Sequence, residues 1–600
     1  MKNKIKYLIE LSFFVGLVFV SCEDFLNTTS KSTMDEKVSF SNLDFATQQI
    51  LSIYQIMNED AGYSKRLSLY YGIDSDIEMI SGADDDGRRG LSRYKPTPNN
   101  SELESPWTNL YLGIERANIC IDNLPESVIW SDPAFSEQAK ILYAEAITLR
   151  ALYYFELIKV WGDVPFKEHK TQAGDNFFLG KTDRDVIYKR IIEDLKEVAD
   201  YLPWYKEMGT VERVTKGFAK GLRAKIALYY AGYSLRADGT TKRPDDWKNY
   251  YQIARDECNE IIESRIHQLN PSYVNIFRNH CSYTMDLEYG ESMYETAFGR
   301  GNCGEIGDFI GIKHHVSSKY GRGDGGVLTH PYYLYSFDPE DVRKDVTVAI
   351  YDYNDASNPN VQNLSKGYAL RIGKWRKQWI VPVMGGGESD QKFTGVNWCL
   401  MRYSDILLMF AETENEINNA PTEKAKEAFR LVRERAFPES DRQSKVYDYI
   451  NGLTSKDAFF EALVNERKLE FGGEMLRKFD LVRWNLLGNK IAEAKEENLR
   501  MLNPADTKYA TLPNNLFYKR EGEAIEVLNL YERLTESSIE GYEKSTWLSG
   551  MSDKDKESFD KEITNNIANG YDPAKNNHLY PIHQNVINDS NGVLSNDIIK

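Results

Sequence analysis

Helical periodicity is the clearest pattern in the first half of the chain. Its strongest example covers residues 135–161, where Leu142, Leu149 and Phe155 belong to one apolar stripe. Residues three or four positions apart lie on the same face of an α-helix, so this spacing predicts a long helix with an apolar face. The same pattern predicts helices over residues 46–57, 107–124, 184–202, 215–235 and 247–264.

The pattern changes between residues 271 and 397. This segment is rich in Gly, Asn, Asp and Tyr and contains no long helical repeat. Short apolar pieces within it, such as residues 293–298, look like isolated strands. A segment of this length is too long for an idle loop, and irregular segments held on a rigid scaffold often carry function. We therefore expect residues 271–397 to contribute to the functional site.

Helical periodicity returns over residues 402–418, 422–436 and 455–485. Consecutive helices of this length favour a mainly all-α fold, built as a tetratricopeptide-like helical array with long irregular loops and a few short strands. The 34-residue repeat signature of true tetratricopeptide proteins is not evident. The prediction of an array therefore depends on the succession of helices alone.

The first residues predict export and a lipid anchor. Three lysines within the first six residues precede an apolar run over residues 11–20, and Ser21 then stands directly before Cys22. This order is typical of a secretory signal, and the run is shorter than the roughly 20 residues that cross a bilayer. A small residue before a Cys resembles the processing site of bacterial lipoproteins. We expect residues 1–21 to be removed, Cys22 to be acylated, and residues 22–40 to form a flexible tether.

Composition narrows the possible partners. The net charge of −17 disfavours nucleic acid and anionic membrane surfaces. The chain has 38 Tyr and 10 Trp, and side chains of this kind are common at binding surfaces. Without Cys22, five cysteines remain, an odd number that excludes a complete disulfide framework. A pair between Cys281 and Cys303 stays open at this point.

Signatures of catalysis and of cofactor binding are incomplete. The glycine pattern over residues 299–304 matches a dinucleotide fingerprint, but the Gly-rich residues that follow do not favour the required helix. His314 and His315 lack the spacing and the Glu of a zinc protease site. We expect no catalytic residue, no metal and no cofactor. With 91 acidic residues, a pair of glycosidase carboxylates remains an open alternative.

Several stretches of sequence carry a resemblance to a known family. In chain order they are residues 22–26 (CEDFL), residues 107–165 (from WTNLY to WGDVP), residues 402–412 (RYSDILLMFAE), residues 465–484 (from NERKLEF to RKFDLVRW) and residues 579–582 (LYPI). Together they resemble the SusD/RagB family of outer-membrane nutrient-uptake lipoproteins. Residues 500–576 contain no family motif that can be placed, and the usual closing motif is missing from the last residues.

The resemblance implies a binding protein and not an enzyme. It implies a lipid-anchored protein on the outer membrane, facing outwards, that captures a glycan and delivers it to a SusC-like TonB-dependent transporter. Capture of peptides, as in the RagB branch, is the first alternative, and a surface glycosidase is the second. The implied organisation is a helical region over residues 41–270 and a C-terminal region over residues 271–600, with its irregular binding segment at 271–397.

Aromatic side chains in irregular segments are the best candidates for sugar contacts. A sugar packs its C–H face on an exposed ring, while polar neighbours bind its hydroxyl groups. The resemblance implies contacts from the loop before residue 107 and from the irregular segment. Five residues there are candidates: Arg89, Tyr94, Tyr320, Trp375 and Trp379. The alternative for each ring is packing in the core or against a loop.

The charged residues of the family stretches have a structural interpretation. Arg402 and Asp405 are three positions apart on a predicted helix, and Asp480 and Arg483 repeat that spacing. Pairs of this kind tie helices together more often than they perform chemistry. Trp107 is likewise expected in the core, because it lies on a predicted helix face.

Overall fold

The computed structural model describes residues 36–385 and 389–596, and most of its regular structure is helical. The predicted signal peptide, Cys22 and most of the predicted tether lie outside the described residues. Within the described ranges, no helix combines the length and the apolar character that crossing a bilayer requires.

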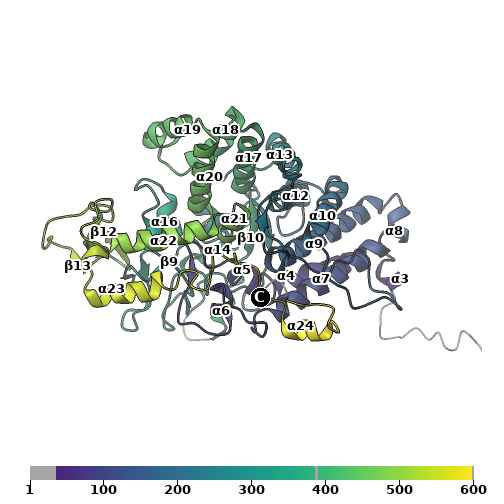
Figure 1. Ribbon diagram of the computed structural model, residues 1–600, viewed down its shortest axis with the longest axis horizontal. Coiled ribbons are helices and arrows are strands. Elements are labelled where there is room, and N and C mark those ends of the chain that lie inside the picture. The colour runs from purple at the N-terminus through teal and green to yellow at the C-terminus, as the bar shows by residue number, and fades with distance from the viewer. Residues whose placement is uncertain (1–35, 386–388, 597–600) are drawn as a thin grey trace, which may run out of the picture.

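The long helices pack on one another in chain order and form one continuous array, from the right-hand side to the top centre of Figure 1. Its members are α4 (Leu43–Asn58), α7 (Glu104–Asn123), α9 (Ser136–Trp161), α10 (Arg184–Val198), α12 (Lys216–Ala231), α13 (Trp247–Ser264), α17 (Tyr403–Asn418), α18 (Glu423–Glu434) and α20 (Lys456–Phe471). This confirms the predicted all-α array. Because α13 packs directly on α17, the array crosses the boundary expected at residue 270, and that division stays a prediction.

Helix α9 is the centre of the first part of the array. Its residues from 144 to 158 are all buried, because apolar side chains occur on every side of the helix and other helices surround it. Three charged residues occur in this stretch: Glu156 pairs with Lys159 on the same helix, and the other two have partners on other segments. Arg150 donates to Asp194 on α10 at 2.8 Å, and Glu145 accepts from Arg213 at 2.6 Å. Gly162, with φ of +76°, ends the helix.

The segment over residues 271–397, which was expected to be irregular, contains several short strands and helices. A four-stranded antiparallel sheet has the order β1 (Met79–Ile80), β5 (Val327–Thr329), β9 (Leu370–Ile372), β6 (Val348–Ala349). The strand expected at 293–298 is β4 (Ser292–Thr296), which pairs with β10 (Trp398–Arg402). The other elements of this region are α14 (Tyr273–Cys281), α15 (Pro331–Leu334), α16 (Arg343–Thr347), β7 (Tyr351–Asp352), β8 (Asn363–Leu364) and the short helix η2 (Lys377–Trp379).

The region between residues 500 and 576 forms a small sheet of its own. Strands β11 (Asn515–Glu521), β12 (Ala524–Val527) and β13 (Glu543–Thr546) pair in the order β12–β11–β13. The neighbouring helices are α21 (Arg477–Arg483), α22 (Leu487–Met501) and α23 (Asp553–Phe559). In Figure 1 this sheet lies at the left-hand end of the molecule, and α8 (Val128–Ser131) lies at the right-hand end.

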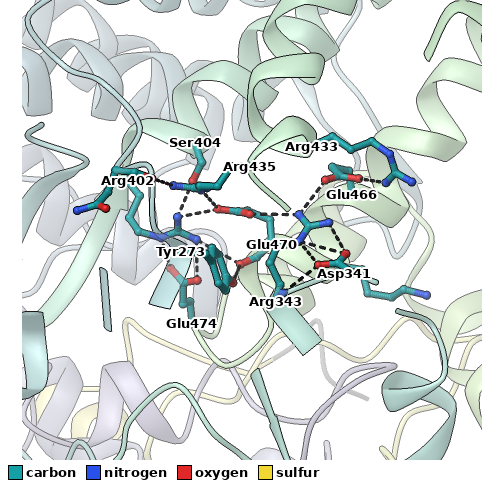
Figure 2. Close-up of polar contacts among 12 residues, drawn as sticks. Tyr273, Asp341, Arg343, Arg402, Ser404, Arg433, Arg435, Glu466, Glu470 and Glu474 are labelled. Atoms are coloured by element: carbon teal, nitrogen blue, oxygen red, sulfur yellow. Dashed lines mark hydrogen bonds and ion pairs between the residues drawn. The ribbon is translucent and has the colours of Figure 1, made fainter. Parts of the chain in front are cut away.

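A buried ionic network joins the helical array to the segment of short strands and helices described above (Figure 2). At its centre, Glu470 on α20 accepts hydrogen bonds from Arg402 at 2.8 Å, Arg435 at 2.7 Å and Arg343 at 3.2 Å. Arg402 also donates to Glu474 at 2.8 Å, through both Nε and Nη2. Buried charges are tolerated because each has close partners of opposite sign. The network therefore has a structural role, as the sequence predicted.

Of the two charged pairs expected from their spacing in the sequence, one forms and the other does not. Asp480 and Arg483 pair at 3.0 Å, as expected from their spacing. Arg402 does not pair with Asp405, because Asp405 binds Lys225 at 2.8 Å and Arg467 at 2.7 Å. Arg402 is the last residue of β10 and precedes the first turn of α17, so the helical spacing assumed for this pair does not hold, and each charge has nearer partners on other segments.

The five cysteines within the described residues are free thiols, so Cys281 and Cys303 are not paired. Burial raises the pKa of the thiols of Cys120 and Cys281 to about 12. These two thiols therefore stay protonated and behave as small apolar side chains.

Candidate functional site

Two of the predicted aromatic contacts lie in the core. The side chain of Tyr94 is 3% exposed, its hydroxyl donates to the Asp74 carbonyl at 2.6 Å, and the Lys478 ammonium lies 4.4 Å from its ring centroid. Trp375 is 1% exposed, and its Nε1 donates to the Gly473 carbonyl at 2.8 Å. The expectation that these rings form a surface for sugars was wrong, because segments distant in the sequence cover both.

Arg89 is bound to its own loop. Its Nε donates to the Ser81 carbonyl at 2.7 Å, and its guanidinium pairs with Asp85 at 2.6 Å. The adjacent Arg88 extends further, to 3.7 Å from a carboxylate oxygen of Asp324. Arg89 therefore stabilises the conformation of this loop.

Tyr320 and Trp379, the other two predicted rings, are partly exposed and are linked through Tyr353, Tyr351 and the Arg376 guanidinium. The ring centroids of Tyr320 and Tyr353 are 5.5 Å apart, and those of Tyr353 and Tyr351 are 5.9 Å apart. The Arg376 guanidinium lies 6.0 Å from the Tyr351 ring and 4.8 Å from the Trp379 ring. We call the three partly exposed rings, Tyr320, Tyr351 and Trp379, the ring strip.

Tyr351 is a member of the strip that sequence reasoning missed. It begins β7 and is followed by Asp352 and Tyr353. Residues two positions apart on a strand share a face, so the Tyr-Asp-Tyr pattern was the available signal. The sequence pattern alone does not show that Tyr351 and Tyr353 lie beside Tyr320; the contact between the Tyr353 and Tyr320 rings shows it.

Tyr353 and His314 form a rigid floor under the strip. Tyr353 is 4% exposed, and the two rings stack with centroids 4.9 Å apart and planes 12° apart. Burial lowers the pKa of His314 to about 3, and burial also raises the pKa of Tyr353 to about 12. Both groups are therefore neutral near pH 7. The amide of Gln362 donates to the Tyr353 hydroxyl at 3.2 Å and adds a polar group at the edge.

The turn between β11 and β12 closes one end of the strip. Glu523 in this turn binds the Lys319 ammonium at 2.6 Å and accepts from the Tyr320 hydroxyl at 3.3 Å. The bond from Lys319 lowers the pKa of Glu523, which keeps its carboxyl group ionised. The backbone N–H of Gln362 also donates to the backbone carbonyl of Glu523, at 2.8 Å. This turn, about two hundred residues away in the sequence, therefore orients Tyr320.

Hollows of several hundred Å³ occur elsewhere on the described surface. One of about 440 Å³ has Trp161, Leu235, Leu579 and Tyr580 among its lining residues. Another of about 720 Å³ lies near the start of α10 and is lined mainly by charged side chains, several of them already paired with one another. Among residues 36–385 and 389–596, no cluster of three His, Cys, Asp or Glu side chains has an arrangement that suits a metal ion.

Comparisons with known proteins match almost the whole length of the chain. A family model described as "SusD family" matches residues 314–598, which include the region where the sequence offered no recognisable motif. A second, described as "Starch-binding associating with outer membrane", matches residues 24–228. A SusD-like protein of Formosa agariphila is 25% identical over 519 residues, which cover 79% of this chain and 89% of the relative.

Solved structures share the fold. A SusD homolog from Bacteroides thetaiotaomicron superposes with a TM-score of 0.72 at 22% identity, covering 93% of this chain and 98% of the homolog. Surface glycan-binding protein A from the same species, in complex with laminarihexaose, gives a TM-score of 0.60 at 18% identity. That match covers 92% of this chain and 99% of the other.

Proposed function

The chain belongs to the SusD/RagB family, and on that premise we propose that it is a glycan-binding protein of the bacterial outer-membrane surface. The observation that carries this proposal is the ring strip, in which Tyr320, Tyr351 and Trp379 are partly exposed and the buried Tyr353 ring packs against the two tyrosines. The likeness in fold to a glycan-binding protein solved with laminarihexaose supports it.

Weak and reversible capture fits this arrangement. An aromatic side chain buries at most about 150–250 Å². If a sugar covers half of that area, one ring contributes roughly 2–3 kcal/mol at ~25 cal/mol/Å². Two or three rings, reduced by the cost of ordering the ligand, give dissociation constants of about mM to µM. A protein that passes its ligand to a transporter benefits from such modest affinity.

Isothermal titration of the protein against laminarin, starch and acidic oligosaccharides, with peptides in parallel, tests the proposal. We expect at least one glycan to bind in the mM to µM range, no peptide to bind, and no new reducing ends to appear during incubation. Binding of a peptide while every glycan fails would support the RagB-like alternative. Release of new reducing ends would support a glycosidase.

We further propose that Cys22 carries the lipid anchor and that the protein delivers its glycan to a SusC-like TonB-dependent transporter. The apolar run before Cys22 and the match to a family model for outer-membrane association support this location. The transporter follows from family membership alone.

Replacing Cys22 with alanine is expected to abolish labelling by a palmitate analogue and to release the protein from the membrane fraction. Each buried CH₂ of an acyl chain contributes about 0.8 kcal/mol to membrane binding, so loss of the chains removes the anchor. Metabolic labelling followed by fractionation measures both effects. Cys303→Ala, which removes a partly exposed thiol, is the matched control and should keep the label. A labelled Cys22→Ala protein would contradict the assignment.

Replacing Glu523 with glutamine is expected to weaken glycan binding about two- to fivefold without changing thermal stability. The exposed contact with Lys319 contributes little to folding, but it orients the Tyr320 ring. Titration and differential scanning calorimetry measure the two effects. Glu521→Gln, at the end of β11 and paired with Lys519, is the control. Equal affinities for all three proteins would remove Glu523 from the site.

A further inference from the structure

Guanidinium groups gather at the Trp379 end of the ring strip. The Arg376 guanidinium lies 4.8 Å from the Trp379 ring centroid, and the Arg278 guanidinium lies 5.5 Å from the same centroid. Arg278 is exposed and Arg376 is partly exposed. In a chain with a net charge of −17, this end of the strip carries local positive charge.

Neither guanidinium is neutralised by the protein. Within the part of the chain that the structure describes, neither forms an ion pair with a carboxylate inside 4.0 Å. Arg376 donates only to backbone carbonyls, those of Gly373 at 2.7 Å and of Asp345. This differs from the core, where Arg343 and Arg402 each meet several carboxylates.

The nearby carboxylates do not cancel this charge. Glu523, at the far end of the strip, is held by Lys319 at 2.6 Å. The Asp345 side chain is 80% exposed, and its nearest cation is Lys344 at 3.9 Å. The two arginines therefore keep free donors beside a partly exposed ring.

We propose that the ring strip binds an acidic glycan and that Arg278 and Arg376 bind its carboxylate or sulfate groups beside Trp379. This inference depends on the proposed function and specifies the substrate class of the same site. A guanidinium presents planar, paired donors that match the geometry of these anions. The attraction to the Trp379 ring holds each guanidinium in place, so less freedom is lost when the anion binds.

A neutral sugar is expected to bind the Trp379 end of the ring strip with lower affinity than an acidic one. The guanidinium groups of Arg278 and Arg376 lie 5.5 and 4.8 Å from the Trp379 ring centroid, so a neutral sugar that packs on this ring leaves their free donors without an anion. An acidic sugar packs on the ring and pairs with the cations at the same time. The affinity for an acidic glycan should therefore depend on salt, because dissolved ions screen exposed charges.

Titrations with paired oligosaccharides test this inference. The acidic members are oligogalacturonate, oligoalginate and a sulfated carrageenan oligosaccharide, and the neutral members are methyl-esterified oligogalacturonate, desulfated carrageenan and laminarihexaose. We expect the preferred acidic probe to bind about tenfold or more tightly than its neutral counterpart, and this advantage to shrink between about 0.05 and about 0.5 M NaCl. Which acidic probe binds best distinguishes a carboxylated from a sulfated ligand.

Substitutions assign the effect to the two arginines. Arg278→Gln and Arg376→Gln should each weaken binding of the preferred acidic probe about tenfold, and the neutral probes should be unaffected. Arg376→Lys, which keeps the charge, should retain the salt dependence even if bidentate binding is lost. Arg190→Gln changes an exposed arginine on α10 in the helical array; it is the control and should bind like the unaltered protein.

The outcomes separate this inference from the proposed function. If a neutral probe binds as tightly as every acidic one, or if both arginine variants keep full affinity for the acidic probe, the acidic specificity is refuted while glycan binding stands. If none of the six oligosaccharides binds, the proposed function fails as well.

Discussion

Replacing Glu470 with glutamine is expected to lower the free energy of unfolding by about 3–5 kcal/mol. Glu470 is completely buried and is the shared acceptor of Arg343, Arg402 and Arg435. Glutamine has nearly the same shape but no charge, so the substitution leaves an excess of buried positive charge. Denaturant unfolding followed by circular dichroism measures the loss as a lower transition midpoint.

An exposed glutamate on the same helix provides the control. Glu461 is 58% exposed and contacts Lys490 at 3.1 Å. Glu461→Gln should change the unfolding free energy by less than about 0.5 kcal/mol. If Glu470→Gln were no more destabilising than Glu461→Gln, the network would not have the structural role assigned to it.

The same cluster predicts the pH dependence of stability. Burial opposes ionisation of Glu470, but Arg435, Arg402 and Arg343 outweigh burial and hold its pKa well below the usual range. A carboxyl group whose pKa is depressed by folding contributes stability above its unfolded pKa of about 4.3, and this contribution is lost as the pH falls. Stability should therefore fall steeply below about pH 4.5, and less steeply in Glu470→Gln.

Replacing Tyr320 or Trp379 with alanine is expected to weaken glycan binding by about ten- to a hundredfold each. Each ring contributes up to roughly 2–3 kcal/mol before the cost of ordering the ligand, and 1.4 kcal/mol corresponds to about a factor of ten. The double substitution should reduce binding below detection by titration. Folding should be nearly unchanged, because both rings are partly exposed.

Two kinds of control distinguish the ring strip from aromatic side chains in general. Phe177→Ala removes a ring that is 68% exposed in the loop after α9, and it should leave the affinity unchanged. Tyr94→Phe and Trp375→Phe alter buried rings, so they should reduce stability and spare binding. An affinity that survives the loss of both Tyr320 and Trp379 would disprove the proposed site.

The helical array was predictable because its signals are local. The pattern over residues 247–264 predicted α13 with the same limits as the structure, and the pattern over 135–161 predicted α9 within one residue at its start. Apolar residues at helical spacing and clear stop signals decide such elements without reference to the rest of the chain.

The site was only partly predictable because exposure is a tertiary property. Tyr94 follows a charged, Gly-containing stretch and Tyr320 precedes one, so their local contexts are similar. Tyr571 and Lys478 pack on Tyr94 and bury it, whereas Tyr320 keeps an accessible edge. No pattern near either residue carries this information.

The contacts that the site residues make with distant segments could not be predicted from the sequence either. Glu523 reaches Tyr320 across about two hundred residues of sequence, in a region where no family motif was recognisable. Arg402 and Asp405 had the spacing of a pair, but nearer charges on other segments separated them.

The most direct measurement is a crystal structure of the protein with the glycan that binds best in the titrations. Sugar rings packed on Tyr320, Tyr351 and Trp379, with an acidic group beside Arg278 and Arg376, are the predicted result. A glycan in the hollow next to Trp161 and Tyr580, with the ring strip empty, would contradict the proposed site.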